Sequence, residues 1–300
     1  MANRGSSLEL IKPRWGAPAK VRAVTSTRRG GFSSGDFAAL NLANHVGDDP
    51  ALVAANRALL RESLALPAEP LWLDQVHGCD VAVWGNGAVR DPISEASSAE
   101  GEPTRQRLVQ AVGGNPERLE TVRRDAAEQG ADEVRRPRAD ASVVCVPGRV
   151  CVVMTADCLP LLFCDDSGDV VAAAHAGWRG LLEGVIEATV AAMQVAPERI
   201  HAWLGPAIGP NSFEVGPEVR DRFCDRSAEA EAGFVPGVDG RWLADLYLLA
   251  RQRLLVIGVQ RISGGEHCTF VDRERFFSYR RDGRTGRMAS LIWIDSSEPA

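Results

Sequence analysis

The stretch VCVVMTADCLPLLFCDDSGDVVAAAHAGWRGLLEG, residues 150–184, decides the fold. It contains three short apolar runs separated by polar turns; the second covers Leu161–Cys164 and the third Val170–Ala174. Apolar runs of this length between turn residues are typical of buried β-strands. Cys158 and His175 each lie at the end of such a run, where a side chain can leave the core and face a cleft.

A helix is expected directly after the last of these strands. Residues 176–180 form a corner of small residues, and Leu181–Met193 follow with one apolar face. A turn of small residues that enters a helix presents free backbone N–H groups and a positive dipole end, which suits an anion. Arg179 lies in this corner. A thiol, an imidazole, the carboxylate of Asp157 and an anion-binding turn are thus expected close together.

The rest of the chain mixes strands and helices without an internal repeat, which favours a mixed α/β fold. Further elements are expected as a helix from Pro50 to about Leu64, strands at 71–73, 139–149, 200–205 and 259–262, a helix starting near Pro217, a helix over Arg241–Ile257, and two strands around a turn at Asp282–Gly283.

Length and composition exclude several classes of protein. The 300 residues, 45% of them hydrophobic, suffice for a sizeable core. A formal net charge of −6 argues against a nucleic-acid partner. The longest apolar runs fall short of the roughly 20 residues that span a bilayer, and the N-terminus lacks the apolar region of a signal peptide. We therefore expect no membrane partner, and the oligomeric state stays open.

The seven cysteines favour a reduced, cytoplasmic protein. Their number is odd, and they show no tight CxxC spacing. Four of them lie in apolar surroundings and are expected to be small core residues: Cys145, Cys151, Cys164 and Cys224.

Residues 85–138 differ in composition from the rest of the chain. Their first part is rich in Gly, Ser, Glu and Pro and has no aromatic residue; their second part can form one or two polar helices. We interpret this segment as an insertion in a single domain that covers residues 1–300, either a surface excursion or a lid or interface.

Two further segments contain polar residues that are candidates for ligand binding. Arg28 and Arg29, in a loop rich in Gly and Ser, could hold phosphate, and Asn41 and His45 could orient a polar ligand; the alternative is an ordinary surface loop. The short strand at 71–73 ends in the string DQVHG, which contains Gln75 and His77.

Two imidazoles and one thiolate, from His77, Cys158 and His175, make a three-ligand set for zinc. Such a set leaves one position open, which is the pattern of catalytic sites. Copper accepts the same ligands. Two other interpretations stay open at this point: Cys158 and His175 as a nucleophile and its base, or a buried cysteine with two structural histidines.

Five strings in this chain resemble the YfiH-type family, whose members are described as laccase-domain proteins, polyphenol oxidases, purine nucleoside phosphorylases and peptidoglycan editing factors. The resemblance covers about Val21 to Asp295, and only the length of the segment between His77 and Ala139 departs from the family pattern. The strings are LDQVHG, MTADCLPLLF, AAAHAGWRGL, WLGPAIGPNSFEVG and FFSYRRDGRTGRMAS.

The resemblance implies a single domain in which helices flank a layered β-sheet sandwich. It also implies a zinc site at His77, Cys158 and His175, and phosphorolysis of adenosine, inosine, guanosine and methylthioadenosine with adenosine deamination as a side activity. Phosphate would then meet Arg179, Arg280, Arg28 or Arg29. In deamination Asp157 is a candidate proton carrier; the alternative for Asp157 is a turn residue that caps backbone N–H groups.

Three rival functions remain. A copper-dependent polyphenol oxidase is one, although a true laccase needs many more histidines than the five of this chain. A cysteine-dependent hydrolase or amidase acting on peptidoglycan precursors is the second, and it predicts activity that survives chelation. A binding protein without catalysis is the third, and it predicts stabilisation by ligand with no product.

Overall fold

The computed structural model describes residues 8–85 and 136–295. Its largest sheet has the strand order β12-β8-β6-β7-β4-β3, in which β6 pairs antiparallel with both β7 and β8. The strands of this sheet are β3 (Val81–Trp84), β4 (Ala141–Val144), β6 (Leu159–Asp165), β7 (Val171–Ala176), β8 (Ile200–Leu204) and β12 (Arg261–Gly264).

A second sheet, of order β1-β2-β13-β5, joins the two ends of the described chain and packs against the first. It consists of β1 (Leu10–Ile11), β2 (Val21–Ser26), β5 (Val150–Thr155) and β13 (Met288–Ile294). The core between the sheets contains Val153 and Ile292 from one side and Leu162 and Ala173 from the other. The predicted β-sandwich is therefore confirmed.

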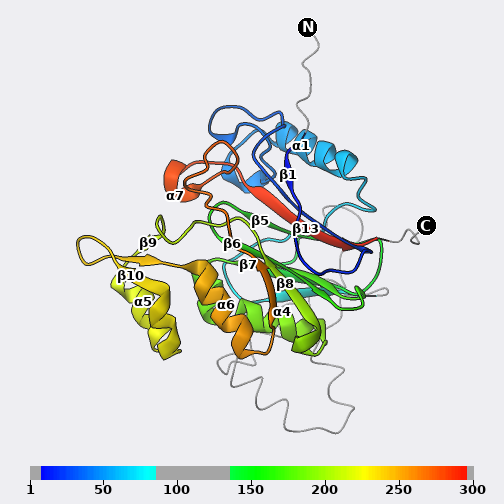
Figure 1. Cartoon of the computed structure of the whole chain (residues 1–300). Helices are drawn as coiled ribbons and strands as arrows, with labels where there is room; N and C mark the ends of the chain where they lie inside the picture. The colour runs from blue at the N-terminus through cyan, green and yellow to red at the C-terminus, as the bar shows by residue number, and fades with distance from the viewer. Residues whose placement is uncertain (1–7, 86–135, 296–300) are drawn as a thin grey trace.

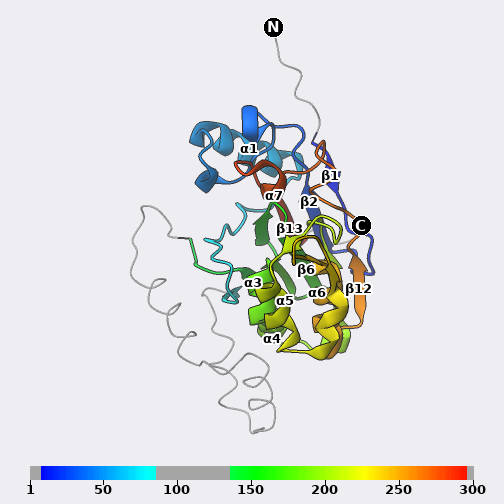
Figure 2. The ribbon, with the colours of Figure 1, turned by 90° about the vertical axis from the view of Figure 1, so that its left-hand side faces the viewer.

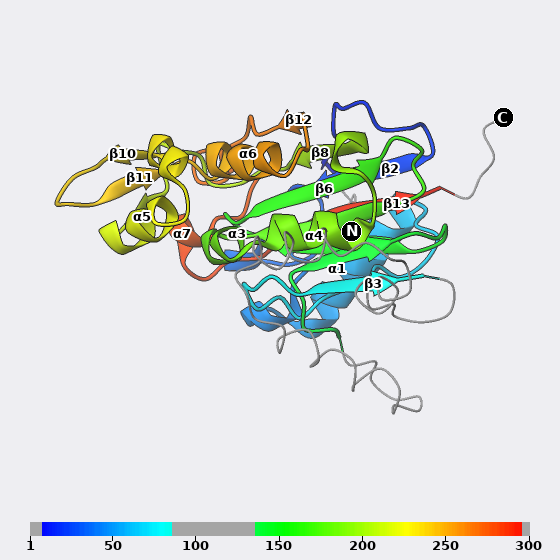
Figure 3. The ribbon, with the colours of Figure 1, turned by 90° about the horizontal axis from the view of Figure 1, so that it is seen from below.

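Helices cover both outer faces of this sandwich (Figure 1). Helix α1 (Pro50–Ser63) lies on the four-stranded sheet, where Leu60 shares a core with Val152 and Leu291. Figures 2 and 3 show helices on the opposite face, along the six-stranded sheet. These helices are α3 (Trp178–Glu183), α4 (Val185–Met193) and α6 (Leu246–Val256).

Because both faces of the six-stranded sheet are covered at its centre, the central strands β6 and β7 are buried along their whole length. In β6, Leu161 and Phe163 belong to the core under the helices, whereas Leu162 and Cys164 belong to the core between the sheets. Successive side chains of a strand point to opposite faces, so a strand buried on both sides reads as a continuous apolar run. This is the physical reason for the pattern in residues 150–184.

A small third sheet and a helix lie at one end of the molecule, where Figure 3 shows them beside α6. The sheet has the order β10-β11-β9. These elements, together with the last short helix of the chain, are β9 (Glu214–Val215), α5 (Pro217–Cys224), β10 (Phe234–Pro236), β11 (Trp242–Ala244) and α7 (Tyr279–Asp282).

Several expected elements have different bounds. The single helix expected over Leu181–Met193 begins earlier, at Trp178, and is divided by Gly184, whose φ of 106° ends α3. The helix expected from Arg241 begins only at Leu246, because the preceding residues pair as β11. Asp245 caps α6 by accepting a hydrogen bond from the N–H of Leu248 at 3.0 Å.

The prediction of a C-terminal hairpin around Asp282–Gly283 is also wrong for the first of its two strands. Ser278 accepts a hydrogen bond from the N–H of Arg281, so Tyr279–Asp282 forms α7, and only β13 is a strand. Residues 71–73 contribute an isolated bridge from Leu71 to Cys151 rather than a strand. In contrast, α1 begins at Pro50 as expected, and Asp49 caps it.

Most of the proposed insertion at 85–138 lies outside the described residues and stays a prediction. All seven cysteines are free thiols; Cys151 and Cys164 are buried as expected, Cys224 is half-buried, and Cys145 is exposed, contrary to expectation. Among the helices of the described residues, none combines the length and apolar character that crossing a membrane requires.

Candidate functional site

Three residues that are distant in sequence bring their donor atoms together at one edge of the sandwich. His77 lies in the loop before β3, Cys158 in the turn between β5 and β6, and His175 near the end of β7. Their ligand atoms all lie within 4.8 Å of one another. The two imidazole rings meet edge to face, with centroids 4.8 Å apart. The set could hold one metal ion, which agrees with the sequence-based selection of these residues.

Sequence reasoning missed Asp140, a fully buried residue that organises this cluster. Its Oδ1 lies 2.8 Å from Nδ1 of His175 and accepts the backbone N–H of His77 at 2.9 Å. Its Oδ2 accepts the N–H of Gly78 at 2.7 Å. Because Nδ1 of His175 is engaged by this carboxylate, Nε2 is the atom left to bind a ligand. One side chain thus positions both histidines.

The thiol and imidazole of the cluster carry opposite charges when no metal is bound. Burial raises the pKa of the Cys158 thiol, but the charge of His175 and hydrogen bonds from both histidines outweigh burial and lower the pKa to about 6. Burial lowers the pKa of His175, whereas the Cys158 thiolate and Asp140 raise it to about 9. A thiolate beside an imidazolium is therefore the dominant form between these two values.

Gly177 leaves room for this arrangement. A Cβ at this position would come within 3.0 Å of the Cys158 Sγ and 3.3 Å of the His77 Cδ2. Any residue larger than glycine at this position would therefore displace Cys158 and His77, two of the three donor residues. The glycine of the HAGWRG string therefore allows close packing of Cys158 and His77 at the site.

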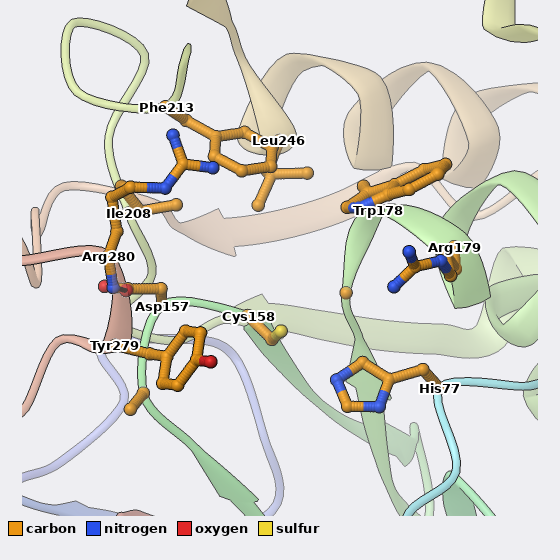
Figure 4. Close-up of a pocket in the computed structure, with 12 residues that line it drawn as sticks. His77, Asp157, Cys158, Trp178, Arg179, Ile208, Phe213, Leu246, Tyr279 and Arg280 are labelled. Atoms are coloured by element: carbon orange, nitrogen blue, oxygen red, sulfur yellow. Dashed lines mark hydrogen bonds between the residues drawn. The ribbon is translucent and has the colours of Figure 1, made fainter. Parts of the chain in front are cut away.

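A pocket of about 220 Å³ opens beside the cluster (Figure 4). In this view Arg179 and His77 lie on one side and Tyr279 and Arg280 on the other, with Cys158 between them. Further lining residues are Ala156, Asp157, Gly177, Trp178, Ile208, Phe213 and Leu246. The pocket therefore combines two of the three candidate metal ligands with aromatic rings and guanidinium groups.

The two arginines of the pocket differ in how they are held. Arg280 donates from Nη1 to the carbonyl of Glu214 at 2.6 Å, and its guanidinium lies 5.2 Å from the centre of the Phe213 ring. Arg179 is exposed, stacks on Trp178 at 4.6 Å, and makes no hydrogen bond or ion pair with any residue in 8–85 or 136–295. Arg179 is therefore available to a ligand.

Asp157 lines the pocket, but its carboxylate is occupied by protein donors. Oδ1 accepts the Thr269 hydroxyl at 2.6 Å, and Oδ2 accepts the Ser278 hydroxyl at 3.0 Å and the N–H of Arg280 at 2.7 Å. The residue has a left-handed backbone, with φ of 89°. These contacts attach the Asp157–Cys158 turn to the start of α7.

The remaining sequence candidates lie outside the pocket lining. Arg28 donates to the carbonyls of Ala38 and Arg273, and Arg29 pairs with Glu9 and Glu274. Both guanidinium groups therefore connect loops rather than face the pocket.

The polar candidates Asn41, His45 and Gln75 also act within the protein or at its surface. Asn41 is buried and accepts the N–H of Arg287 at 3.0 Å. His45 is exposed, and its pKa is lowered by partial burial and by the charge of Arg287. Gln75 exchanges two hydrogen bonds with the backbone of Met154 in β5, which holds the DQVHG loop against the sheet.

Comparison with known proteins places this architecture in a family. A family model described as "Multi-copper polyphenol oxidoreductase laccase" matches residues 22–295. A Pseudomonas aeruginosa protein named purine nucleoside phosphorylase is 47% identical over 285 residues, which cover 95% of this chain and 98% of that protein. Purine nucleoside phosphorylase YfiH of Escherichia coli is 46% identical over 286 residues, with 95% and 99% covered.

A solved structure shares the fold. The crystal structure of a Neisseria meningitidis protein superposes with a TM-score of 0.76 at 42% sequence identity, covering 96% of this chain and 99% of that one. The chain therefore belongs to the YfiH-type family, whose model carries the multi-copper polyphenol oxidoreductase laccase description.

Proposed function

We propose that this protein is a zinc-dependent purine nucleoside phosphorylase that acts on adenosine, inosine, guanosine and methylthioadenosine. One observation carries the proposal: a three-donor cluster opens into a pocket that also holds aromatic rings and the guanidinium of Arg179, which has no hydrogen-bond or ion-pair partner among the described residues. The names of the relatives from Pseudomonas aeruginosa and Escherichia coli point to the same reaction.

His77, Cys158 and His175 would hold the zinc ion, and the donor set fits it. Two imidazoles and one thiolate are ligands that zinc accepts, and the carboxylate behind His175 is the usual outer partner of a zinc-bound histidine. When bound, zinc would supply Lewis-acid polarisation of a substrate oxygen or nitrogen. Copper accepts the same donors and remains the alternative metal.

The chain's own side chains would position the two reactants. In phosphorolysis a phosphate oxygen attacks C1′ of the sugar while the purine leaves. Arg179 would hold the phosphate dianion, because its guanidinium is exposed at the pocket and has no partner among the described residues. Trp178, Phe213 and Tyr279 offer ring faces on which a purine can stack.

Three finer points belong to the same proposal. Adenosine deamination as a side activity would need a proton carrier, and Asp157 is the candidate on the pocket wall. Arg280 is a second candidate for phosphate. A cytoplasmic location stays a prediction from the cysteine pattern.

A cysteine-dependent hydrolase is the second candidate, and one observation favours it. Cys158, His175 and Asp140 form a thiolate, imidazolium and carboxylate series that resembles the order of a nucleophile, its base and an orienting acid. Such an enzyme would act on an amide or ester and would not need a metal.

One experiment separates these functions. We would measure the metal content of the purified protein and the release of hypoxanthine from inosine with and without phosphate. One zinc per chain and phosphate-dependent release support the proposal. Absence of hypoxanthine release, together with hydrolysis of an amide or ester that survives chelation but not alkylation, would favour the cysteine enzyme, and phenol oxidation with bound copper would favour the oxidase.

Substitution at the cluster tests the site with a matched control. Cys158→Ala should abolish both metal content and hypoxanthine release. Cys151→Ala removes a thiol that is buried in the core between the sheets and should keep both. Full release by the Cys158→Ala variant would overturn the assignment of the site.

A further inference from the structure

Arg287 lies next to the pocket, although none of the preceding arguments uses it. It immediately precedes β13, and the register of the sheet pairs Met288 with Thr155. Arg287 is therefore adjacent to Ala156, which lines the pocket and precedes the Asp157–Cys158 turn. Its guanidinium carbon lies 5.8 Å from the centre of the Tyr279 ring, another lining residue.

Half of the Arg287 side chain is fixed by the protein. Nη1 donates to the carbonyls of Thr285 at 2.9 Å and Gly286 at 3.0 Å. The backbone N–H is held by the buried side chain of Asn41. These bonds do not use the side-chain atoms Nε and Nη2. Together these two atoms form the edge of a guanidinium group that can bind two oxygens of one carboxylate or phosphate.

That edge has no partner within the described residues. Neither Nε nor Nη2 donates to any of them, and Arg287 has no carboxylate oxygen within 4.0 Å among them. Arg281 of the same string differs, because it pairs with Asp282 at 2.7 Å and donates to the carbonyls of Thr269 and Phe270. Arg287 is partly buried, so its charge is neither neutralised by a described carboxylate nor fully solvated.

Arg287 interacts electrostatically with groups of the site. Burial lowers the pKa of Arg287, and the groups that oppose this effect are Cys158, Asp157 and Tyr279. In Figure 4 the hydroxyl of Tyr279 points towards Cys158, across the pocket. Arg287 therefore lies behind Ala156 and Tyr279, two residues of the pocket lining.

We propose that Arg287, together with Tyr279, forms a subsite that binds a phosphate group of the ligand in this pocket. The phosphate would lie against the Nε–Nη2 edge, on the opposite side of the site from Arg179. It could belong to inorganic phosphate or to the 5′ position of a nucleotide. The inference deepens the proposed function and rests on it for the identity of the nucleoside.

Binding measurements test the subsite without turnover. Isothermal titration calorimetry of the metal-loaded protein would use inorganic phosphate, adenosine and AMP. In Arg287→Gln we expect the affinity for phosphate-bearing ligands to fall by about tenfold or more, because a charge-assisted pair is lost. The affinity for adenosine should stay within about twofold. Arg284→Gln is the matched control, since Arg284 is exposed and donates to the carbonyl of Gly47.

The two sources of phosphate give different results. Loss of inorganic phosphate binding alone assigns the subsite to the co-substrate, and loss of the advantage of AMP over adenosine assigns it to a nucleotide. Arg287→Lys keeps the charge without the side-on edge and should lose several-fold in affinity. This variant carries the test if Arg287→Gln does not fold, as judged by its melting temperature.

Unchanged phosphate and AMP affinities in both Arg287 variants would overturn the subsite, as would a wild-type protein that binds neither ligand. Absence of phosphorolysis in the wild type would instead overturn the proposed function. The two failures are therefore distinguishable.

Discussion

Asp140 and His175 form a buried pair in which a carboxylate oxygen lies 2.8 Å from Nδ1 of the imidazole, and the same carboxylate holds the loop that carries His77. Hydrogen bonds from His175 and from the N–H groups of the loop outweigh burial and lower the pKa of Asp140. The carboxylate is therefore charged, and it keeps the proton of His175 on Nδ1.

Asp140→Asn should weaken metal binding more than it weakens the fold. In the wild type, Oδ2 of Asp140 accepts hydrogen bonds from the N–H groups of Val76 and Gly78. The amide oxygen of asparagine can still accept a hydrogen bond from His175, but its NH₂ group would then face these two N–H donors and could not accept from them. Loss of an outer carboxylate of this kind costs about 10–100-fold in metal affinity. Competition with a chromophoric chelator measures that affinity.

Asp74→Asn is the control, because Asp74 is exposed and lies 3.9 Å from Arg138. If Asp140→Asn binds zinc as tightly as the wild type, Asp140 has no role in orienting the ligands.

Gly177→Ala should disturb the cluster by steric contact alone. The backbone of Gly177 has φ of −64° and ψ of 163°, which alanine adopts freely, so strain does not enter. The new Cβ would push Cys158 and His77, and we expect metal affinity to fall by at least about tenfold, the scale of disturbances close to a metal. Metal titration of the purified variant measures the change.

Gly78→Ala is the matched control in the same site. Its Cβ would lie 3.7 Å from the nearest atoms, which is ordinary contact. Equal affinities of the two variants would show that the close packing at Gly177 does not matter.

The metal-free protein should have one unusually reactive thiol. Because the pKa of Cys158 is lowered to about 6, its thiolate is present at neutral pH and is lost as the pH falls through about 6. Alkylation of Cys158 by iodoacetamide, followed site by site by mass spectrometry, should therefore reach half its maximal rate near pH 6.

Cys151 serves as the internal control, because burial raises the pKa of its thiol to about 12 and the side chain is fully buried. Zinc should suppress the reaction of Cys158. A half-maximal rate of Cys158 near pH 8 or 9 would contradict the ion pair with His175.

The role of Asp157 can be tested by comparing Asp157→Asn with a variant of one of its hydrogen-bond partners. If the carboxylate only attaches the turn to α7, then Thr269→Ala and Asp157→Asn should both raise the KM for the nucleoside and leave the pH dependence of kcat unchanged. The saturated hydrogen bonding of the carboxylate favours this result. Loss of one limb of the pH profile in Asp157→Asn alone would instead identify a proton carrier.

The layered fold and the donor residues were predictable from the sequence for a local reason. Strands buried on both faces read as apolar runs, so β6 and β7 stand out in residues 150–184. Polar residues at the ends of such runs can leave the core and face a cleft, which singled out Cys158 and His175. The helix from Pro50 was equally readable, because Asp49 and Pro50 are start signals that act on their own neighbours.

The predictions that failed depended on contacts with distant parts of the chain. Residues 242–244 were assigned to a helix, but they pair with strands on both sides as β11. Residues 279–282 were expected to belong to the hairpin, but they form the short helix α7. The N–H of Arg280 donates to the carboxylate of Asp157, which is 123 residues away in sequence. Such long-range pairings outweigh the local propensity of a segment for helix or strand.

Local sequence patterns were enough to predict the central apolar strands, the start of α1 and the side chains that are chemically able to bind a metal, since these features depend on neighbours within a few positions. Which polar groups meet depends instead on the three-dimensional arrangement of the chain. Asp140 reaches the loop of His77 from 63 positions away, and Arg28 and Arg29 are bound by carbonyls and carboxylates instead of a ligand. One edge of Arg287, next to the pocket, has no partner within residues 8–85 and 136–295. The register of the sheets sets these encounters, and no local pattern records it.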